Sequence, residues 1–114
     1  MARRVDVVLQ EIFDAIMLVE SELSRHTEAS FSRALFLQRA TERSLEIISE
    51  ATRHLPDALI ATKPEIAWGE VRGIGNRLRH EYWRVDSGLI WSIVMDDLPA
   101  LKTAIEDLLR GIEE

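Results

Sequence analysis

Apolar residues recur three or four positions apart over most of this 114-residue chain. Of all the features of the sequence, this period restricts the possible folds most. Side chains at that spacing line one face of an α-helix. The first stripe predicts a helix over residues 5–25, and the second predicts a helix over residues 34–55, where Leu55-Pro56 ends the pattern. The main stripe positions are Val8, Ile12, Ile16, Val19 and Leu23, then Leu37, Thr41, Leu45, Ile48 and Thr52.

The second half of the chain contains helix start signals as well as stripes. Thr62-Lys63-Pro64-Glu65 has the pattern of a capping box with proline in the first turn, which predicts a short helix that reaches Trp68. A third main helix is expected over residues 70–83. Its inward positions are Val71, Ile74, Leu78 and Tyr82.

A fourth helix is expected to begin after Asp86, whose carboxylate suits an N-cap. Pro99 should kink or restart this helix, with Asp97 as the new cap. The expected buried positions are Leu89, Ile90, Ile93, Val94, Leu101, Ile105, Leu108 and Ile112.

These helices predict an all-α fold, because no β-type alternation occurs and the linkers are short. We expect an antiparallel up-down four-helix bundle with a short extra helix, forming a single domain over residues 1–114. Burying a leucine or isoleucine contributes only about 3 kcal/mol, so a homodimer would cover useful additional surface. The chain has no cysteine, and its apolar runs are too short for a signal peptide or membrane span. A mature cytoplasmic protein is therefore expected.

Charge is distributed unevenly along the chain. The formal net charge is −6, which by itself argues against a nucleic-acid partner. Residues 72–84, here called the basic island, contain four arginines against Glu81 alone, a local net charge of +3. The other residues include ten basic and nineteen acidic side chains, a net charge of −9. The island therefore indicates a local site for an anion.

Four residues of the basic island fall at steps of four, four and three, and so form one polar stripe on the expected helix: Arg72, Asn76, His80 and Trp83. Arg79 borders this stripe. Histidine can serve as a general base or acid near neutral pH, and arginine can offset charge developing on phosphorus. This chemistry requires no metal or cofactor. The candidates for RNA binding are Arg72, Arg77, Arg79, Arg84 and Trp83.

Two less specific interpretations remain open at this point. The basic island could be an ordinary solvated face, since exposed charge runs are common. Trp83 could stack on an RNA base or simply pack within the fold.

The segment GNRLRHEY, followed by WRVD, resembles the signature of the HepT-like family of HEPN domains, the toxin half of a bacterial toxin–antitoxin pair. Three other segments also resemble this family, so the resemblance covers residues from about 5 to 112: RATERSLEIISEATRHLP, KPEIAW and LIWSIVMDDLPALKTAIEDLL.

The resemblance implies a dimeric all-α bundle in which two motifs form one composite cleft for metal-independent endoribonuclease cleavage of cellular RNA. It makes His80 the catalytic acid or base, matches Asn76 to the polar residue after the motif arginine, and makes Tyr82 the target of AMPylation by a partner nucleotidyltransferase antitoxin of the MntA type. Adding charge there would repel RNA.

The chain departs from the family signature at one position. Gly75 stands five residues before His80, where the family has its arginine. This change removes a charge-assisted phosphate ligand, so weakened activity is expected. Arg72 and Arg79, one turn to either side, are the candidates to reach the same phosphate. The rival hypotheses are a non-catalytic helical partner that binds a nucleotidyltransferase or RNA without cleavage, and a dimerisation bundle without RNA affinity.

Overall fold

The computed structural model describes residues 4–79 and 86–113, which contain helices and no strand. The all-α prediction is therefore confirmed. The elements are α1 (Val5–Leu23), α2 (Glu28–Phe31), α3 (Leu35–Thr52), α4 (Asp57–Ile60), α5 (Trp68–Arg72), α6 (Ile74–Leu78), α7 (Ser87–Ser92), the π-helical segment η1 (Ile93–Asp97) and α8 (Leu98–Glu113).

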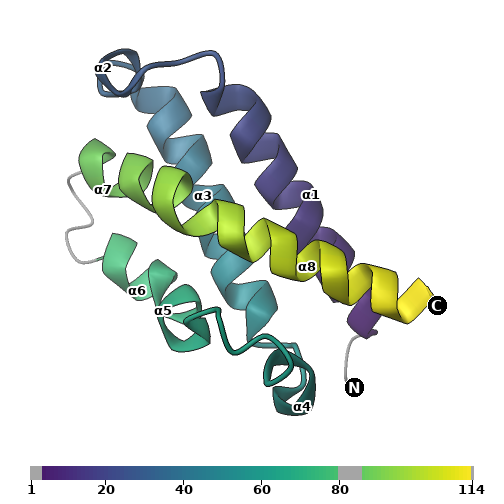
Figure 1. Ribbon diagram of the computed structural model, residues 1–114. Helices are drawn as coiled ribbons and strands as arrows, with labels where there is room; N and C mark the ends of the chain where they lie inside the picture. The colour runs from purple at the N-terminus through teal and green to yellow at the C-terminus, as the bar shows by residue number, and fades with distance from the viewer. Residues whose placement is uncertain (1–3, 80–85, 114) are drawn as a thin grey trace.

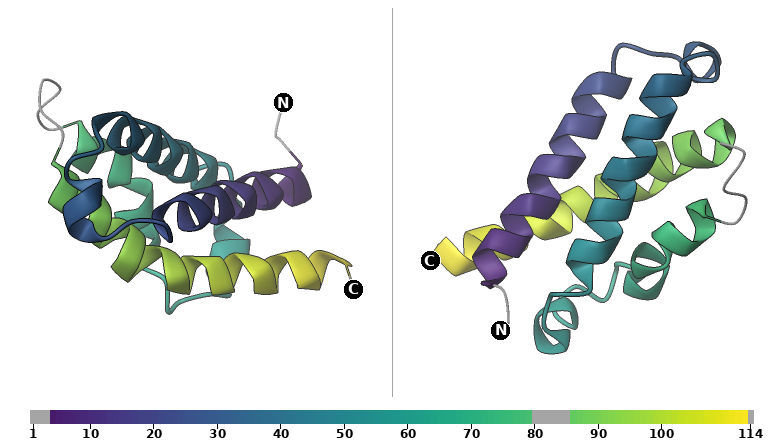
Figure 2. Two further views of the ribbon diagram at one scale, coloured as in Figure 1. Left: turned by 90° about the horizontal axis from the view of Figure 1, so that it is seen from above. Right: turned by 180° about the vertical axis from the view of Figure 1, so that it is seen from behind.

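The helices run up and down in the predicted antiparallel order. Helices α1 and α3 lie side by side, and the rod formed by α7, η1 and α8 crosses one face of this pair (Figures 1 and 2). Helices α5 and α6 pack against α3 on its other side (Figure 1). Helix α3 therefore contacts α1, α2, α5, α6 and α7, and residues 72–79 of the basic island lie beside it.

The predicted apolar stripes form the core. Val8, Ile12 and Ile16 of α1 are completely buried, as are Leu45 and Ile48 of α3. Each such side chain contributes about 1.5–3 kcal/mol through removal from water. The prediction was wrong for Ile112, which is 45% exposed in the last turn of α8.

The polar segment after α1 forms a helical turn that the sequence stripes did not predict. The Ser30 amide donates to Thr27 Oγ1 at 3.1 Å, and the Thr27 amide donates to Ser30 Oγ at 2.9 Å. This reciprocal capping box begins α2. It carries the fully buried Phe31, whose ring centroid lies 5.5 Å from that of Trp91.

The expected capping box at residues 62–65 is not formed. Thr62 Oγ1 instead donates to the Leu59 carbonyl at 2.6 Å, beside the short helix α4. Helix α5 begins at Trp68 rather than ending there, and its N-cap Ala67 supplies no side-chain hydrogen bond. The Trp68 indole N–H donates to the Lys63 carbonyl at 3.0 Å, so this loop is held by the indole and not by a cap.

The predicted helix over residues 70–83 is interrupted at Gly73, which ends α5 and precedes α6 with φ −90° and ψ −3°. A methyl group at this glycine would lie 3.2 Å from the Gly69 carbonyl oxygen, a close contact that glycine avoids. Helix α6 ends at Leu78. Residues 80–83 of the predicted helix lie outside the described residues.

The prediction for the last helix was correct at its start and wrong for Asp97. Asp86 Oδ1 accepts a hydrogen bond from the Leu89 amide at 3.0 Å, so the N-cap is confirmed. Asp97 is not a second cap, because α8 follows η1 without interruption (Figure 1). The wider π-helical turn directly before Pro99 accommodates a residue that has no amide donor.

Candidate nucleic-acid interface

A polar cavity of about 270 Å³ lies between α3 and the described part of the basic island. Helix α3 contributes Glu46, Ser49 and Glu50 to its wall, and Arg53 follows at the end of that helix. The other wall consists of four residues that the sequence singled out: Arg72, Gly75, Asn76 and Arg79. The structure therefore brings most of the described candidate residues into one site. Arg77 is exposed on α6 but does not line this cavity.

Arg72 is committed to the end of α3. Its Nη2 donates to the Thr52 carbonyl at 2.9 Å and to the Leu55 carbonyl at 3.2 Å, and its Nε donates to Thr52 at 3.2 Å. Its Nη1 lies 3.7 Å from Asp57 Oδ1, and the side chain is only 24% exposed. Arg72 is thus built into the wall, where it binds the last carbonyl of α3 and that of Leu55 just beyond the helix.

The backbone of Arg72 completes this junction between α3 and α5. Its carbonyl accepts hydrogen bonds from Ser49 Oγ at 2.9 Å and from Arg53 Nη2 at 2.8 Å. Arg53 Nε also lies 3.7 Å from Glu50 Oε2. Both arginines at this end of the cavity therefore have partners within the protein.

The two carboxylates of the cavity are also paired. Glu46 lies 3.4 Å from Arg43 Nη1, and Glu50 lies near His54 as well as Arg53. Because these pairs offset the negative charge, an anion near Arg79 would not face two unpaired carboxylates.

Arg79 occupies a different position from Arg72. Within the part of the chain that the structure describes, its guanidinium makes no hydrogen bond or ion pair, and the residue is exposed. A methyl group at the buried Gly75 would lie 2.9 Å from Arg79 Nη2 and 3.9 Å from Ser49 Oγ. The guanidinium of Arg79 therefore lies over Gly75 and next to Ser49.

Sequence reasoning missed the contribution of α3 to this site. Glu46, Glu50 and Arg53 are spaced four and three residues apart on one face of α3, a polar pattern visible in the sequence. The pattern alone does not indicate which other helix lies opposite. The remaining candidates, His80, Tyr82, Trp83 and Arg84, lie outside the described residues, so their predicted roles stay predictions.

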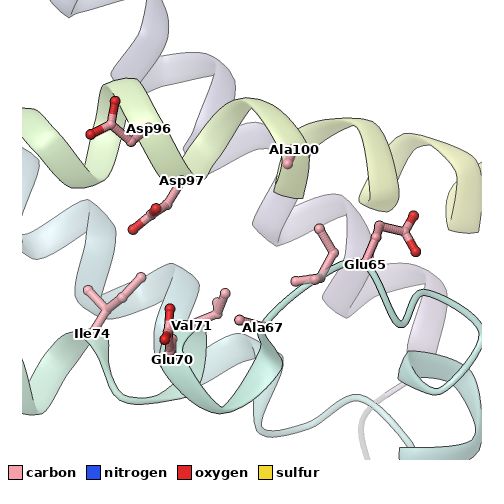
Figure 3. A pocket seen from close by; sticks show the side chains of 9 residues that line it. Glu65, Ala67, Glu70, Val71, Ile74, Asp96, Asp97 and Ala100 are labelled. Atoms are coloured by element: carbon pink, nitrogen blue, oxygen red, sulfur yellow. The ribbon is translucent and has the colours of Figure 1, made fainter.

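A second pocket lies on another side of α5 and has the opposite electrostatic character. Its volume is about 190 Å³, and four acidic residues are among those that line it: Glu65, Glu70, Asp96 and Asp97 (Figure 3). Val71 and Ile74 provide apolar surface there. This wall would repel a phosphate, so the arginine-lined cavity beside α3 is the better candidate for a nucleic-acid interface.

Comparison with known proteins identifies the family. The sequence profile described as "Ribonuclease HepT-like" matches residues 12–108. The chain is similar to "Probable ribonuclease HepT" of Thermococcus cleftensis, with 35% identity over 102 residues that cover 90% of this chain and 93% of that protein.

It is also similar to "Gamma-glutamylcyclotransferase and putative RNase MJ0434" of Methanocaldococcus jannaschii, with 36% identity over 114 residues. All of this chain is covered there, but it spans only 50% of the length of that relative. No solved structure matches the chain significantly. The chain belongs to the HepT-like ribonuclease family, as the motif segments predicted.

None of the helices in residues 4–79 and 86–113 has the length and apolar character needed to cross a membrane.

Proposed function

We propose that this chain is the toxin component of a toxin–antitoxin system and acts as a metal-independent endoribonuclease on cellular RNA in the cytoplasm. The observation that carries the proposal is the arginine-lined cavity between α3 and the described part of the basic island, in a chain of the HepT-like ribonuclease family. The cavity supplies guanidinium and amide donors for a phosphodiester, and His80, the next residue in the sequence after Arg79, supplies a group that can exchange protons near neutral pH.

In the proposed reaction, His80 accepts the proton of a ribose 2′-hydroxyl, and the 2′-oxygen attacks the adjacent phosphorus. The bond between phosphorus and the 5′-oxygen breaks, and that oxygen leaves with a proton taken from solvent water. The products are a cyclic 2′,3′-phosphate and a free 5′-hydroxyl. An arginine offsets the negative charge that develops on the equatorial phosphate oxygens.

The proposed active form is a homodimer in which two basic islands share one cleft. The proposed regulator is an MntA-like nucleotidyltransferase that transfers AMP from ATP to Tyr82. The adduct would place negative charge two residues from His80 and so repel RNA. A mass increase of one AMP on wild-type chain, but not on Tyr82→Phe, after incubation with such an antitoxin and ATP would support this regulation.

Cleavage of total cellular RNA in the presence of a metal chelator tests the central proposal. We expect slow cleavage by the wild type, none by His80→Ala, and faster cleavage by Gly75→Arg, which restores the family arginine. A methyl group at Gly75 would contact mainly the far end of the Arg79 side chain, so a larger residue can be accommodated if Arg79 moves. Wild-type cleavage that is unchanged in His80→Ala would overturn the assigned role of His80.

A non-catalytic binding partner is the second candidate function. It is favoured by Gly75 and by the full engagement of Arg72 with the end of α3, which together leave few cations for transition-state charge. RNA binding without cleavage by both the wild type and Gly75→Arg would favour this alternative.

A further inference from the structure

The position of the Arg79 side chain depends on the absence of a side chain at residue 75. A Cβ at Gly75 would lie 2.9 Å from Arg79 Nη2 and 3.7 Å from Arg79 Cζ. The first distance is too short for a stable carbon–nitrogen contact, so any larger residue at this position would displace the guanidinium. Gly75 itself is buried in α6, and Arg79 directly follows that helix.

Arg79 is also the arginine of this cavity that remains available for an external anion. Arg72 donates to the Thr52 and Leu55 carbonyls, and Arg53 donates to the Arg72 carbonyl. The guanidinium of Arg79 has no such partner among residues 4–79 and 86–113. Its planar donors suit two oxygens of one phosphate.

The neighbouring polar groups also indicate that an anion would bind at Arg79. The hydroxyl of Ser49 donates its proton to the Arg72 carbonyl, so it has no proton left for an anion. Asn76 is exposed and lines the cavity, and its side-chain amide can donate. An anion in the cavity would therefore be bound by Arg79 together with Asn76.

We infer that Arg79 binds an RNA phosphate in this chain and that Gly75 acts as a positioning residue, because its missing side chain leaves the space in which the Arg79 guanidinium lies. This inference rests on the proposed function, since that function names RNA as the source of the phosphate. It assigns Gly75 a role in positioning the Arg79 guanidinium, in addition to the loss of the family arginine.

Binding of a labelled single-stranded RNA oligonucleotide in chelator tests the inference. Arg79→Gln and Gly75→Ala are each expected to weaken binding about tenfold, the effect of losing one charge-assisted contact. The double variant should bind no more weakly than either single variant, because both changes remove the same contact. Gly75→Ala should melt at the same or a higher temperature than the wild type, since alanine favours a helix.

Two control variants match these substitutions. Gly69→Ala makes the same change in α5, where a methyl group would meet nothing within 4 Å. Arg110→Gln removes the same charge near the far end of α8 (Figure 1). Both should bind RNA as the wild type does. RNA binding by Gly75→Ala equal to that of the wild type, or additive losses in the double variant, would overturn the positioning role.

Inorganic pyrophosphate separates this inference from the proposed function. We expect it to shift the Arg79 Nε–Hε resonance in the wild type and to leave that resonance unmoved in Gly75→Ala. If pyrophosphate shifts the resonance but no RNA binds, the anion site is supported and the RNA function is overturned. If pyrophosphate leaves the wild-type resonance unchanged, the inference is overturned even when RNA binds elsewhere.

Discussion

Arg72 caps the C-terminal end of α3 through Thr52, whose carbonyl oxygen lies 2.9 Å from Arg72 Nη2 and 3.2 Å from Arg72 Nε. Thr52 is completely buried, so this bond fixes α5 against the core of the bundle. The last carbonyls of a helix have no partner within that helix. Here the Thr52 carbonyl accepts from the Leu55 amide at 3.2 Å and from the Arg72 guanidinium, so a neighbouring helix adds to the capping of α3.

Replacing Arg72 should therefore affect the stability of the fold more than it affects RNA binding. We expect Arg72→Gln to lower the free energy of unfolding by about 1.5–3 kcal/mol, the range for hydrogen bonds to charged groups. Lysine should restore little of this stability, because it lacks the planar set of donors. Urea unfolding measures the effect. Arg77→Gln, at an exposed position on the adjacent α6, should stay within about 0.5 kcal/mol of the wild type.

Phe31 should be among the most sensitive positions of the core, although it lies on a four-residue helix. Its side chain is 0% exposed and packs against Trp91. Phe31→Ala is expected to cost about 3–5 kcal/mol through lost contacts and a residual cavity. Phe36→Ala is the matched control, since Phe36 is 88% exposed. Denaturant midpoints that fall equally in both variants would contradict the packing described for α2.

The carboxyl of Asp107 should make stability depend on pH at the acidic end. The hydrogen bond from Arg110, and then that from Lys63 Nζ at 3.2 Å, lower the pKa of Asp107. The stabilisation is therefore present above the unfolded-state pKa, near 4, and is lost as the pH falls through the lower folded-state pKa. The difference in urea midpoint between the wild type and Asp107→Asn should disappear at the acidic end. A constant difference down to low pH would show that charge is not its cause.

Lys102 should have the corresponding effect at alkaline pH. Its Nζ lies 2.9 Å from Glu20 Oε1, and this hydrogen bond, followed by the carboxylate charge, raises the pKa of Lys102. Because the folded-state pKa is raised, the stabilisation is complete below the unfolded-state pKa, near 10.4, and is lost as the pH rises through the folded-state pKa. Lys102→Met should remove this alkaline loss of stability. Thermal midpoints measured from neutral to alkaline pH would report it, and an identical alkaline decline in both proteins would contradict the role of this pair.

Long, regular stripes allowed the main helices to be predicted. The start of α1 and the buried positions Ile12 and Ile16 follow from a three-to-four-residue period. The cap at Asp86 follows from a side chain that reaches only three residues along the chain. The wrong predictions concern short segments where a local motif, such as a capping box, was the main signal. Thr62 matched a cap motif, but its hydroxyl bonds back to Leu59 instead.

The candidate site was predictable only as a set of residues on one stretch of chain. Arg72, Gly75 and Asn76 could be placed together because they are close in sequence. The different functions of these residues could not be predicted, because they depend on contacts with α3. Ser49 and Arg53, which complete the Arg72 junction, lie about twenty residues away in the sequence.

The sequence by itself determined the helical class, the main apolar faces and the position of the basic island, because each depends on neighbouring residues and on the period of a helix. Only the tertiary structure distinguished the two arginines, because among the described residues the Arg72 guanidinium donates to carbonyl oxygens and that of Arg79 has no such partner. The Thr52 and Leu55 carbonyls lie where the Arg72 guanidinium can reach them, whereas the missing side chain of Gly75 leaves room for the Arg79 guanidinium to lie over it. The direction of a long side chain is set by the partners that packing brings within reach, and those partners come from distant parts of the chain.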